Sequence, residues 1–230
     1  MKGGAVRDDP ESMDRWATFD CYGTLIDWNR GIGRELERLF GADHAARLLT
    51  RYHELEPQVQ HEDSSRTYRD VLNATLARLA ESEGLPLPAK ESDALASSLP
   101  DWPAFPDVRP ALEELRSHGF RLAILSNTDR DLVDASIRRI GVEFELAIVA
   151  SEIGSWKPSP WHWEVFLARS GADREHVVHV AQSLFHDVAP CVQLGLPVVW
   201  INRLGEEAEP QPTRELRSLG GLPDVLEALV

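Results

Sequence analysis

Four short segments of the sequence place polar side chains directly after apolar runs. They are FDCYGT (19–24), ILSNT (124–128), WKP (156–158) and VAQSLFHD (180–187). The carboxylate of Asp20 has the chemistry of a nucleophile that forms a covalent ester or acyl-phosphate, although an aspartate here can also simply cap a turn. Lys157 supplies a positive charge that would hold Asp20 ionised beside an anionic group. These residue types together favour a nucleophilic site.

The other polar positions extend this interpretation. Ser126 and Asn127 offer a hydroxyl, an amide and backbone N–H groups just before a predicted helix, where carboxylates and phosphates bind readily; plain helix capping is the alternative. Asp187 is a possible second acid that pairs with Lys157 or orients water, or it is a surface charge. The chain has only three lysines against 21 arginines, and Lys157 stands between Trp156 and Pro158.

Alternating strand and helix patterns predict how these segments are positioned. Strands are predicted at 15–20, 120–127, 144–151, 176–183 and 197–203. Helices are predicted at 109–119, 129–141, 159–171 and 184–195. This alternation is typical of an α/β fold, a Rossmann-like parallel sheet with helices on both faces. The reactive crevice of such a sheet lies at the carboxyl ends of its strands, where the four polar segments would meet.

A helical insertion interrupts the α/β pattern after the first strand. Helical spacing runs from Trp28 to about Glu83 and continues at 89–99, and four prolines in 100–110 mark a hinge. We therefore predict an α/β core domain with an inserted all-helical cap domain over the crevice. The predicted divisions are a flexible leader (1–14), the core (15–27 and 106–230) and the cap with its hinge (28–105).

Composition narrows the possible partners and compartment. The 230 residues carry a formal net charge of −14, which disfavours binding to a nucleic-acid backbone. Cys21 and Cys191 cannot make a disulfide framework, which favours a reducing compartment. The sequence has no apolar run long enough to span a bilayer, and its first residues lack the apolar region of a signal peptide. We expect a cytoplasmic protein with no membrane partner.

With these four motifs in this order, the chain resembles the haloacid dehalogenase superfamily from about residue 15 onward. The phosphatases of that superfamily have a second aspartate two residues after the nucleophile and an acidic Mg²⁺ ligand in the fourth motif. Tyr22 and Gln182 occupy those positions here. The motif DxYGT instead resembles the (S)-2-haloacid dehalogenase branch, which uses no metal or other cofactor. A halide leaves without a proton, so that chemistry needs no acid at position 22.

The resemblance assigns roles to individual residues. It implies that Asp20 is the nucleophile, with Thr24 and Lys157 supporting it and Asp187 retained beside them. A cap arginine would receive the halide, and Arg51 matches by its spacing, with Arg47 as the competitor. The expected substrate-binding residues are Cys21 and Tyr22 through their backbone N–H groups, Ser126, Asn127, Trp163, Gln182, Ser183 and His186.

The fourth motif departs from the branch. Gln182 and Leu184 replace its serine and asparagine, and a leucine cannot hold the hydrolytic water. Gln182 and His186 are the candidates for that task, His186 as a base near neutral pH or else as a surface imidazole. Trp163 stands where the branch often has tyrosine. Pocket lining and core packing are both open for four tryptophans, Trp28, Trp156, Trp161 and Trp163.

The leading hypothesis is a metal-independent hydrolase that displaces halide from a small 2-halocarboxylate through an Asp20 ester. Its partners would be the carboxylate substrate and water, and a homodimer is consistent with this branch. Three alternatives stay open: a hydrolase of another 2-substituted carboxylate, a Mg²⁺-dependent phosphatase, and a non-catalytic binding protein on the same fold.

Overall fold

The computed structural model describes residues 14–63 and 66–230, so the predicted leader lies almost wholly outside the described residues. Within this part of the chain, six parallel strands form one sheet in the order β3-β2-β1-β4-β5-β6. The strands are β1 (Trp16–Phe19), β2 (Arg121–Ser126), β3 (Leu146–Val149), β4 (Val177–Ala181), β5 (Val198–Ile201) and β6 (Arg214–Leu216).

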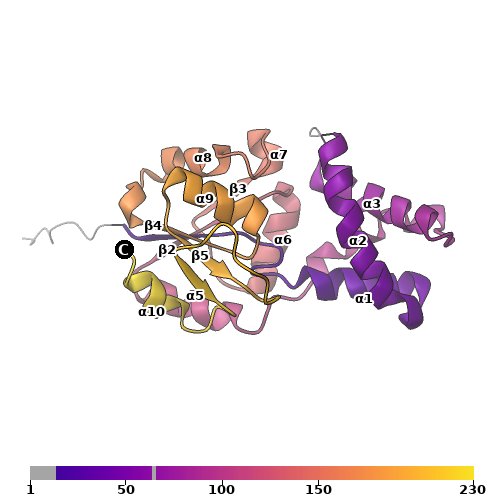
Figure 1. The fold of residues 1–230 in the computed structure, drawn as a ribbon, viewed down its shortest axis with the longest axis horizontal. Helices are drawn as coiled ribbons and strands as arrows, with labels where there is room; N and C mark the ends of the chain where they lie inside the picture. Colours follow the sequence, from indigo (N-terminus) through magenta and orange to yellow (C-terminus); the bar gives the residue numbers. More distant parts are fainter. Residues whose placement is uncertain (1–13, 64–65) are drawn as a thin grey trace, which may run out of the picture.

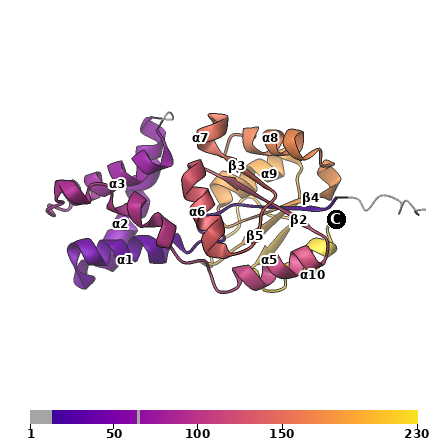
Figure 2. The same ribbon diagram turned by 180° about the vertical axis from the view of Figure 1, so that it is seen from behind.

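Helices cover both faces of this sheet, and a second group of helices lies beside it (Figure 1, Figure 2). The helices beside the sheet are α1 (Trp28–Phe40), α2 (Ala42–Glu62), α3 (Tyr68–Ser82) and α4 (Ala94–Ser98), with 3-10 turns at Ala89–Glu91 and Leu99–Asp101. The helices against the sheet are α5 (Val108–Ser117), α6 (Arg130–Ile140), α7 (Ala150–Ile153), α8 (Trp161–Ser170), α9 (Ala189–Leu194) and α10 (Leu222–Glu227). The predicted α/β fold with a helical insertion is confirmed.

Alternation along the strands builds a separate core on each face of the sheet. In β2, Leu122 and Ile124 pack with α5 and α6, whereas Ala123 and Leu125 pack with α8 and α9. The first of these cores continues through Leu25 and Ile26 into the helices beside the sheet. Because both faces are buried, the strands carry the nearly continuous apolar runs that made them recognisable in the sequence.

The two segments that link the sheet to the inserted helices are hydrogen-bonded to each other. The Asp27 N–H donates to the Pro103 carbonyl at 2.8 Å, and the Phe105 N–H donates to the Leu25 carbonyl at 3.0 Å. Arg203 stacks on the Phe105 ring and pairs with Asp107 at 3.1 Å. Both crossings are therefore tied to each other and to the core.

The structure differs from the predicted elements at three places. The last strand, β6, was not predicted, because its three residues are largely exposed and carry no apolar run. The predicted strand at 144–151 ends at Val149 and turns into α7. The predicted helix at 184–195 begins as a widened π turn (Leu184–Val188) before α9. Among the described helices, none is both long and apolar enough to cross a membrane.

Candidate active site

The strand order brings the predicted polar segments to one edge of the sheet. β2 and β4 flank β1, so the residues after these strands meet at the carboxyl edge of the sheet. The Asp20 N–H continues the ladder by donating to the Val180 carbonyl at 3.1 Å. The sheet therefore fixes the position of Asp20 at its carboxyl edge, where α/β proteins commonly bind their ligands.

Two donors hold the Asp20 carboxylate. Lys157 Nζ donates to Oδ1 at 2.9 Å, and the Thr24 hydroxyl donates to Oδ2 at 2.8 Å. The Thr24 oxygen in turn accepts the Gln182 N–H at 2.9 Å, which ties the first motif to the fourth. Gly23 makes the intervening turn with φ of 91°, a conformation that favours glycine. Asp20 is thus oriented but keeps an exposed fraction of 8%.

Lys157 links three elements from a fully buried position. Besides Asp20, its ammonium donates to Asp187 Oδ1 at 2.6 Å and to the Leu125 carbonyl at 2.8 Å. Burial alone would lower the pKa of Lys157, but the carboxylates of Asp187 and Asp20 outweigh it and hold that pKa above its ordinary value. Lys157 is therefore a permanent cation beside the Asp20 carboxylate.

Asn127 positions the Lys157 backbone. Its Oδ1 accepts the Lys157 N–H at 2.6 Å, and its Nδ2 donates to the Lys157 carbonyl at 2.9 Å. Asn127 also lines the pocket described below. Its amide is thus used to clamp the loop that carries the lysine.

Asp187 is buried rather than a surface charge. Burial would raise its pKa, but Lys157 and a hydrogen bond from His179 together hold the pKa of Asp187 below its ordinary value. His179 Nε2 lies 2.9 Å from Asp187 Oδ1, and its Nδ1 lies 2.8 Å from the Thr18 hydroxyl. His179 was missed in the sequence, where it is one polar residue inside the apolar run VVHVA; its central place in a buried strand was the available signal.

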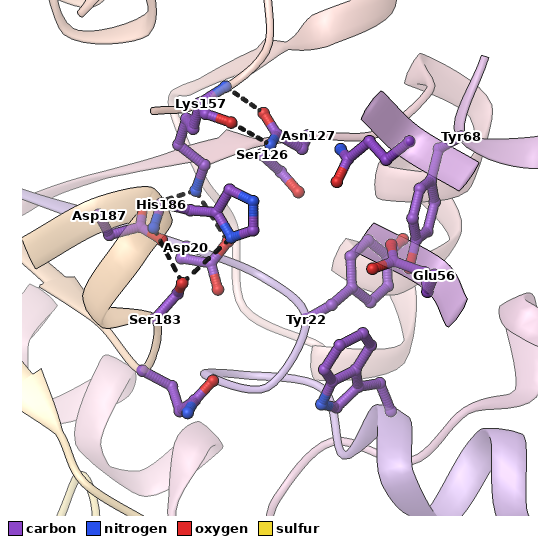
Figure 3. A pocket seen from close by; sticks show the side chains of 13 residues that line it. Asp20, Tyr22, Glu56, Tyr68, Ser126, Asn127, Lys157, Ser183, His186 and Asp187 are labelled. Carbon is purple, nitrogen blue, oxygen red and sulfur yellow. Dashed lines mark hydrogen bonds and ion pairs between the residues drawn. The ribbon is translucent and has the colours of Figure 1, made fainter. Parts of the chain in front are cut away.

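A small pocket of about 110 Å³ lies over Asp20, between the strand ends and the inserted helices (Figure 3). It is far smaller than the roughly 300–1,000 Å³ of pockets for drug-sized ligands. Ser126, Asn127, Gln182, Ser183 and His186 line it from the sheet side, as predicted for residues near a substrate. The opposite wall holds Tyr22, Glu56 and Tyr68 (Figure 3).

His186 faces this pocket beside Asp20 (Figure 3). Its Nδ1 lies 3.1 Å from the Ser183 hydroxyl, which also accepts the His186 N–H at 3.0 Å. Burial lowers the pKa of His186, so the imidazole is neutral at neutral pH. The interpretation of His186 as a surface imidazole is therefore wrong, because the residue lines the pocket.

The structure does not bring Arg51 into the pocket. Its side chain is 40% exposed and pairs with Glu54 at 2.5 Å. Five residues correspond to about 140° around an α-helix, so the buried Glu56 and the outward Arg51 lie on different faces of α2. The competitor, Arg47, is likewise exposed and pairs with Glu83. Glu56, which was not among the predicted site residues, lies on the face of α2 that lines the pocket.

The structure also places Trp163, Cys21 and the other tryptophans considered, and of these expectations only the substrate contact of Trp163 is wrong. Trp163 lies in the core behind the sheet, where it packs edge-on against His179, because it belongs to the sheet-facing side of α8. The Cys21 side chain is fully buried, and burial raises the pKa of its thiol, so only its backbone can serve a substrate. Among the tryptophans considered, Trp28 lines the pocket, Trp156 packs at the core and Trp161 is exposed.

A larger cavity of about 620 Å³ adjoins the small pocket. The two share Trp28, Glu56, Gln182, Ser183 and His186. Its remaining lining includes the apolar side chains of Phe105, Phe185 and Leu204. The small pocket therefore opens into a wider space between the sheet and the inserted helices.

Comparisons with known proteins identify similar chains. A family model described as haloacid dehalogenase-like hydrolase matches residues 15–195. The (S)-2-haloacid dehalogenase of Pseudomonas sp. (strain YL) is 28% identical over 220 residues, 91% of this chain and 93% of that protein. The (S)-2-haloacid dehalogenase 4A of Burkholderia cepacia is 26% identical over 205 residues, 85% of this chain and 86% of that protein.

A solved structure shares the fold at lower identity. The L-2-haloacid dehalogenase from Xanthobacter autotrophicus, with chloropropionic acid covalently bound, matches with a TM-score of 0.81 and 21% identity. The match covers 95% of this chain and 100% of that chain. Sheet, inserted helices and their relative placement are thus common to both proteins.

Proposed function

The chain belongs to the haloacid dehalogenase-like hydrolase family, and on that premise we propose that it is a metal-independent 2-haloacid dehalogenase. The observation that carries the proposal is the Asp20 carboxylate, held by Lys157 and Thr24 at the floor of a small pocket. The similarity to curated (S)-2-haloacid dehalogenases supports the same chemistry.

In the first step, an oxygen of Asp20 attacks C2 of the substrate. The new O–C2 bond forms as the C2–halogen bond breaks, and the bonding electrons leave with the halide. Lys157 orients the Asp20 carboxylate through its hydrogen bond, and Ser126 with the backbone N–H groups of Cys21 and Tyr22 holds the substrate carboxylate. The product of this step is an ester between Asp20 and the 2-hydroxy acid.

In the second step, water attacks the carbonyl carbon of the Asp20 ester. We assign the base to His186: when Nδ1–H donates to the Ser183 oxygen, Nε2 is free to accept a proton from water. The Asp20 carbonyl carbon gains a bond to the water oxygen, and its bond to the ester oxygen then breaks. The hydroxy acid departs with that ester oxygen and takes the second proton of the water, and Asp20 is again a carboxylate. The proton taken by His186 returns to solvent.

The donor set around Asp20 does not suit Mg²⁺. Both carboxylate oxygens already accept hydrogen bonds, from Lys157 and Thr24. Gln182 stands where a carboxylate ligand would be needed, and no cluster of three acidic, histidine or cysteine residues that could bind a metal occurs in residues 14–63 and 66–230. Mg²⁺ prefers several oxygen ligands, commonly including carboxylates. These residues therefore favour chemistry on carbon over phosphoryl transfer.

The test is a single-turnover reaction with excess enzyme in ¹⁸O water containing EDTA. Each enantiomer of 2-chloropropionate is supplied separately, chloride release is measured, and Asp20 is then examined by peptide mass spectrometry. We expect chloride release with one enantiomer and the label in Asp20, because water adds to the ester carbonyl. Label only in the product, or full activity of Asp20→Asn, contradicts the ester route. Hydrolysis of p-nitrophenyl phosphate that requires Mg²⁺ supports the phosphatase alternative instead.

A further inference from the structure

The wall of the pocket opposite Asp20 decides how the leaving group departs. Displacement at a tetrahedral carbon proceeds with the nucleophile and the leaving group on opposite sides of that carbon. With Asp20 at the floor, the halide therefore leaves toward the wall formed by Tyr22, Glu56 and Tyr68 (Figure 3). A departing anion needs hydrogen-bond donors or a positive charge at that place.

Among the residues that the structure describes, no permanent cation lies on that wall. Of the residues that line the pocket, Lys157 alone is a permanent cation, and it lies beneath Asp20 on the far side. The cap arginine expected from the sequence, Arg51, points away and pairs with Glu54. The Tyr22 hydroxyl lies 3.1 Å from the Ser136 hydroxyl, so its hydrogen bond is made with a residue outside the pocket lining. Trp28, Gln60 and Tyr68 also line the pocket and can offer only neutral N–H or O–H donors, whereas Glu56 is the group whose charge decides whether this side accepts or repels an anion.

The Glu56 carboxyl is buried, with an exposed fraction of 8%, and it faces the pocket (Figure 3). It makes no hydrogen bond or ion pair with any residue that the structure describes, although buried carboxylates are normally paired. A buried carboxyl with no cation beside it has a lower free energy in its neutral form, in which it is an O–H donor. Such a donor suits a departing anion, whereas the ionised form would repel it.

We propose that Glu56, in its protonated form, is the hydrogen-bond donor that receives the halide when Asp20 displaces it. The inference rests on the proposed function and gives Glu56 the task expected of Arg51. As the C2–halogen bond breaks, the electron pair goes to the halide and the Glu56 proton is shared with it through the hydrogen bond. The halide then departs as an anion, and the proton stays on Glu56.

The groups around Glu56 place its titration near neutral pH. Burial raises the pKa of Glu56 to about 7, and His61 lowers it in part. Burial also raises the pKa of Tyr52, Tyr68 and Tyr22, so these stay neutral. Asp20 and His186 face it across the pocket, and burial lowers the pKa of His186. Ester formation should therefore slow as the pH rises through about 7.

The experiment measures the rate of Asp20 ester formation by rapid quench and mass spectrometry from pH 5.5 to 9. Wild type should lose about tenfold per pH unit above the pKa of Glu56, since one proton is lost. Glu56→Gln keeps an N–H donor that does not titrate, so the alkaline decline should disappear while substantial activity remains. Glu56→Ala should lower the rate at pH 6 on the order of 10²-fold with 2-chloropropionate, and less with 2-bromopropionate, whose halide leaves more easily. Circular dichroism checks that each variant is folded.

Control variants separate this role from a structural one. Glu54→Gln removes a carboxylate from the same helix at an exposed position and should leave both the rate and its pH dependence unchanged. The inference is overturned if Glu56→Ala forms the ester at the wild-type rate, or if Arg51→Ala or Tyr68→Phe loses more activity with 2-chloropropionate than with 2-bromopropionate and Glu56→Ala does not. These results leave Asp20 esterified. If wild type forms no Asp20 ester, the proposed function itself has failed.

Discussion

Lys157 is the residue on which the charge balance of the site depends. Its ammonium lies 2.9 Å from Asp20 and 2.6 Å from Asp187, and all three side chains are buried or nearly so. Without the lysine between them, these two carboxylates would repel each other. Removing one partner of a buried ion pair costs about 3–5 kcal/mol. A substitution at Lys157 therefore damages folding and chemistry together, and other residues are better tests of mechanism.

His186 offers a cleaner test, because it lies in the pocket and forms no ion pair. We expect His186→Gln to form the Asp20 ester at close to the wild-type rate but to hydrolyse it on the order of 10²–10⁴ times more slowly, the range for loss of a general base. The intact mass of the enzyme after mixing with 2-chloropropionate should show the ester accumulating. Accumulation in Gln182→Ala, with none in His186→Gln, would assign the water to Gln182 instead.

Glu56 also makes the stability of the protein depend on pH. Its pKa is about 7 in the folded protein against an ordinary value of 4.5, so the folded state binds the proton more tightly than the unfolded state. Stability must then fall as the pH rises from about 4.5 to about 7. Glu56→Gln removes this cost, and its advantage over wild type in urea unfolding should grow by up to ~3 kcal/mol between pH 4.5 and pH 8. An advantage that does not change with pH would contradict the buried, unpaired carboxyl.

Residues that follow apolar runs were predictable from the sequence, and residues inside other patterns were not. Asp20, Ser126 and Gln182 stand where strands end, so their convergence follows from parallel strands alone. His179 was hidden because its partner, Asp187, belongs to another element. Glu56 was hidden because which face of α2 turns inward depends on packing that local spacing does not specify.

At the scale of elements, the hinge depends on close contact between α1 and the linker. Gly31 in α1 lies so near the Trp102 ring that an added Cβ would come within 2.3 Å of it. The prolines of the linker suggested a hinge in the sequence, but the contact between Gly31 and Trp102 could not be predicted without the folded structure. The hydrogen bonds between the two crossings lie in the same region, since Asp27 and Pro103 are close in sequence to α1 and Trp102.

We expect Gly31→Ala to destabilise the protein by about 1–3 kcal/mol through overpacking against Trp102. Gly33→Ala, two residues along the same helix, is the matched control. Its Cβ would meet only Leu49 at an ordinary 3.8 Å, so the gain in helix propensity should stabilise the protein by up to about 1 kcal/mol. Urea unfolding of the two variants measures both effects. Equal effects of the two alanines would show that Trp102 moves freely.

The elements that the sequence left out share a physical cause. Strand β6 is stabilised by pairing with β5 at the edge of the sheet. Its own exposed residues show no strand pattern from which this long-range pairing could be predicted. The π turn after Ser183 is defined by backbone hydrogen bonds from Asp187 and Val188 to one carbonyl. That turn carries His186 and Asp187 into the site. The residue types of the fourth motif were recognisable in the sequence, but the π turn that positions them was not.

At the scale of the whole molecule, one core residue anchors the inserted helices over the site. Asp129 precedes α6, yet its carboxylate accepts the N–H groups of Tyr68 at 3.3 Å and Arg69 at 3.0 Å, at the start of α3. Helix N-termini favour such an acceptor, both for the free N–H groups and for the helix dipole. Because Tyr68 lines the pocket, this cap also holds the wall opposite Asp20 in place.

We expect Asp129→Ala to loosen the inserted helices without unfolding the sheet, since loss of a helix cap costs about 0.5–2 kcal/mol. Hydrogen–deuterium exchange should become faster in the first turn of α3 and stay unchanged in β1 and β2. Ester formation at Asp20 should also slow, because Glu56 and Tyr68 are no longer held in position opposite the substrate. Asp131→Ala is the control, because it removes only an exposed ion pair with Arg69, which should contribute less than about 1 kcal/mol. Unaltered exchange in α3 of Asp129→Ala would mean that the apolar contacts alone seat the inserted helices. The wall that receives the leaving group would then owe its position to packing, and Glu56 would be expected to act with the same efficiency in the variant as in wild type.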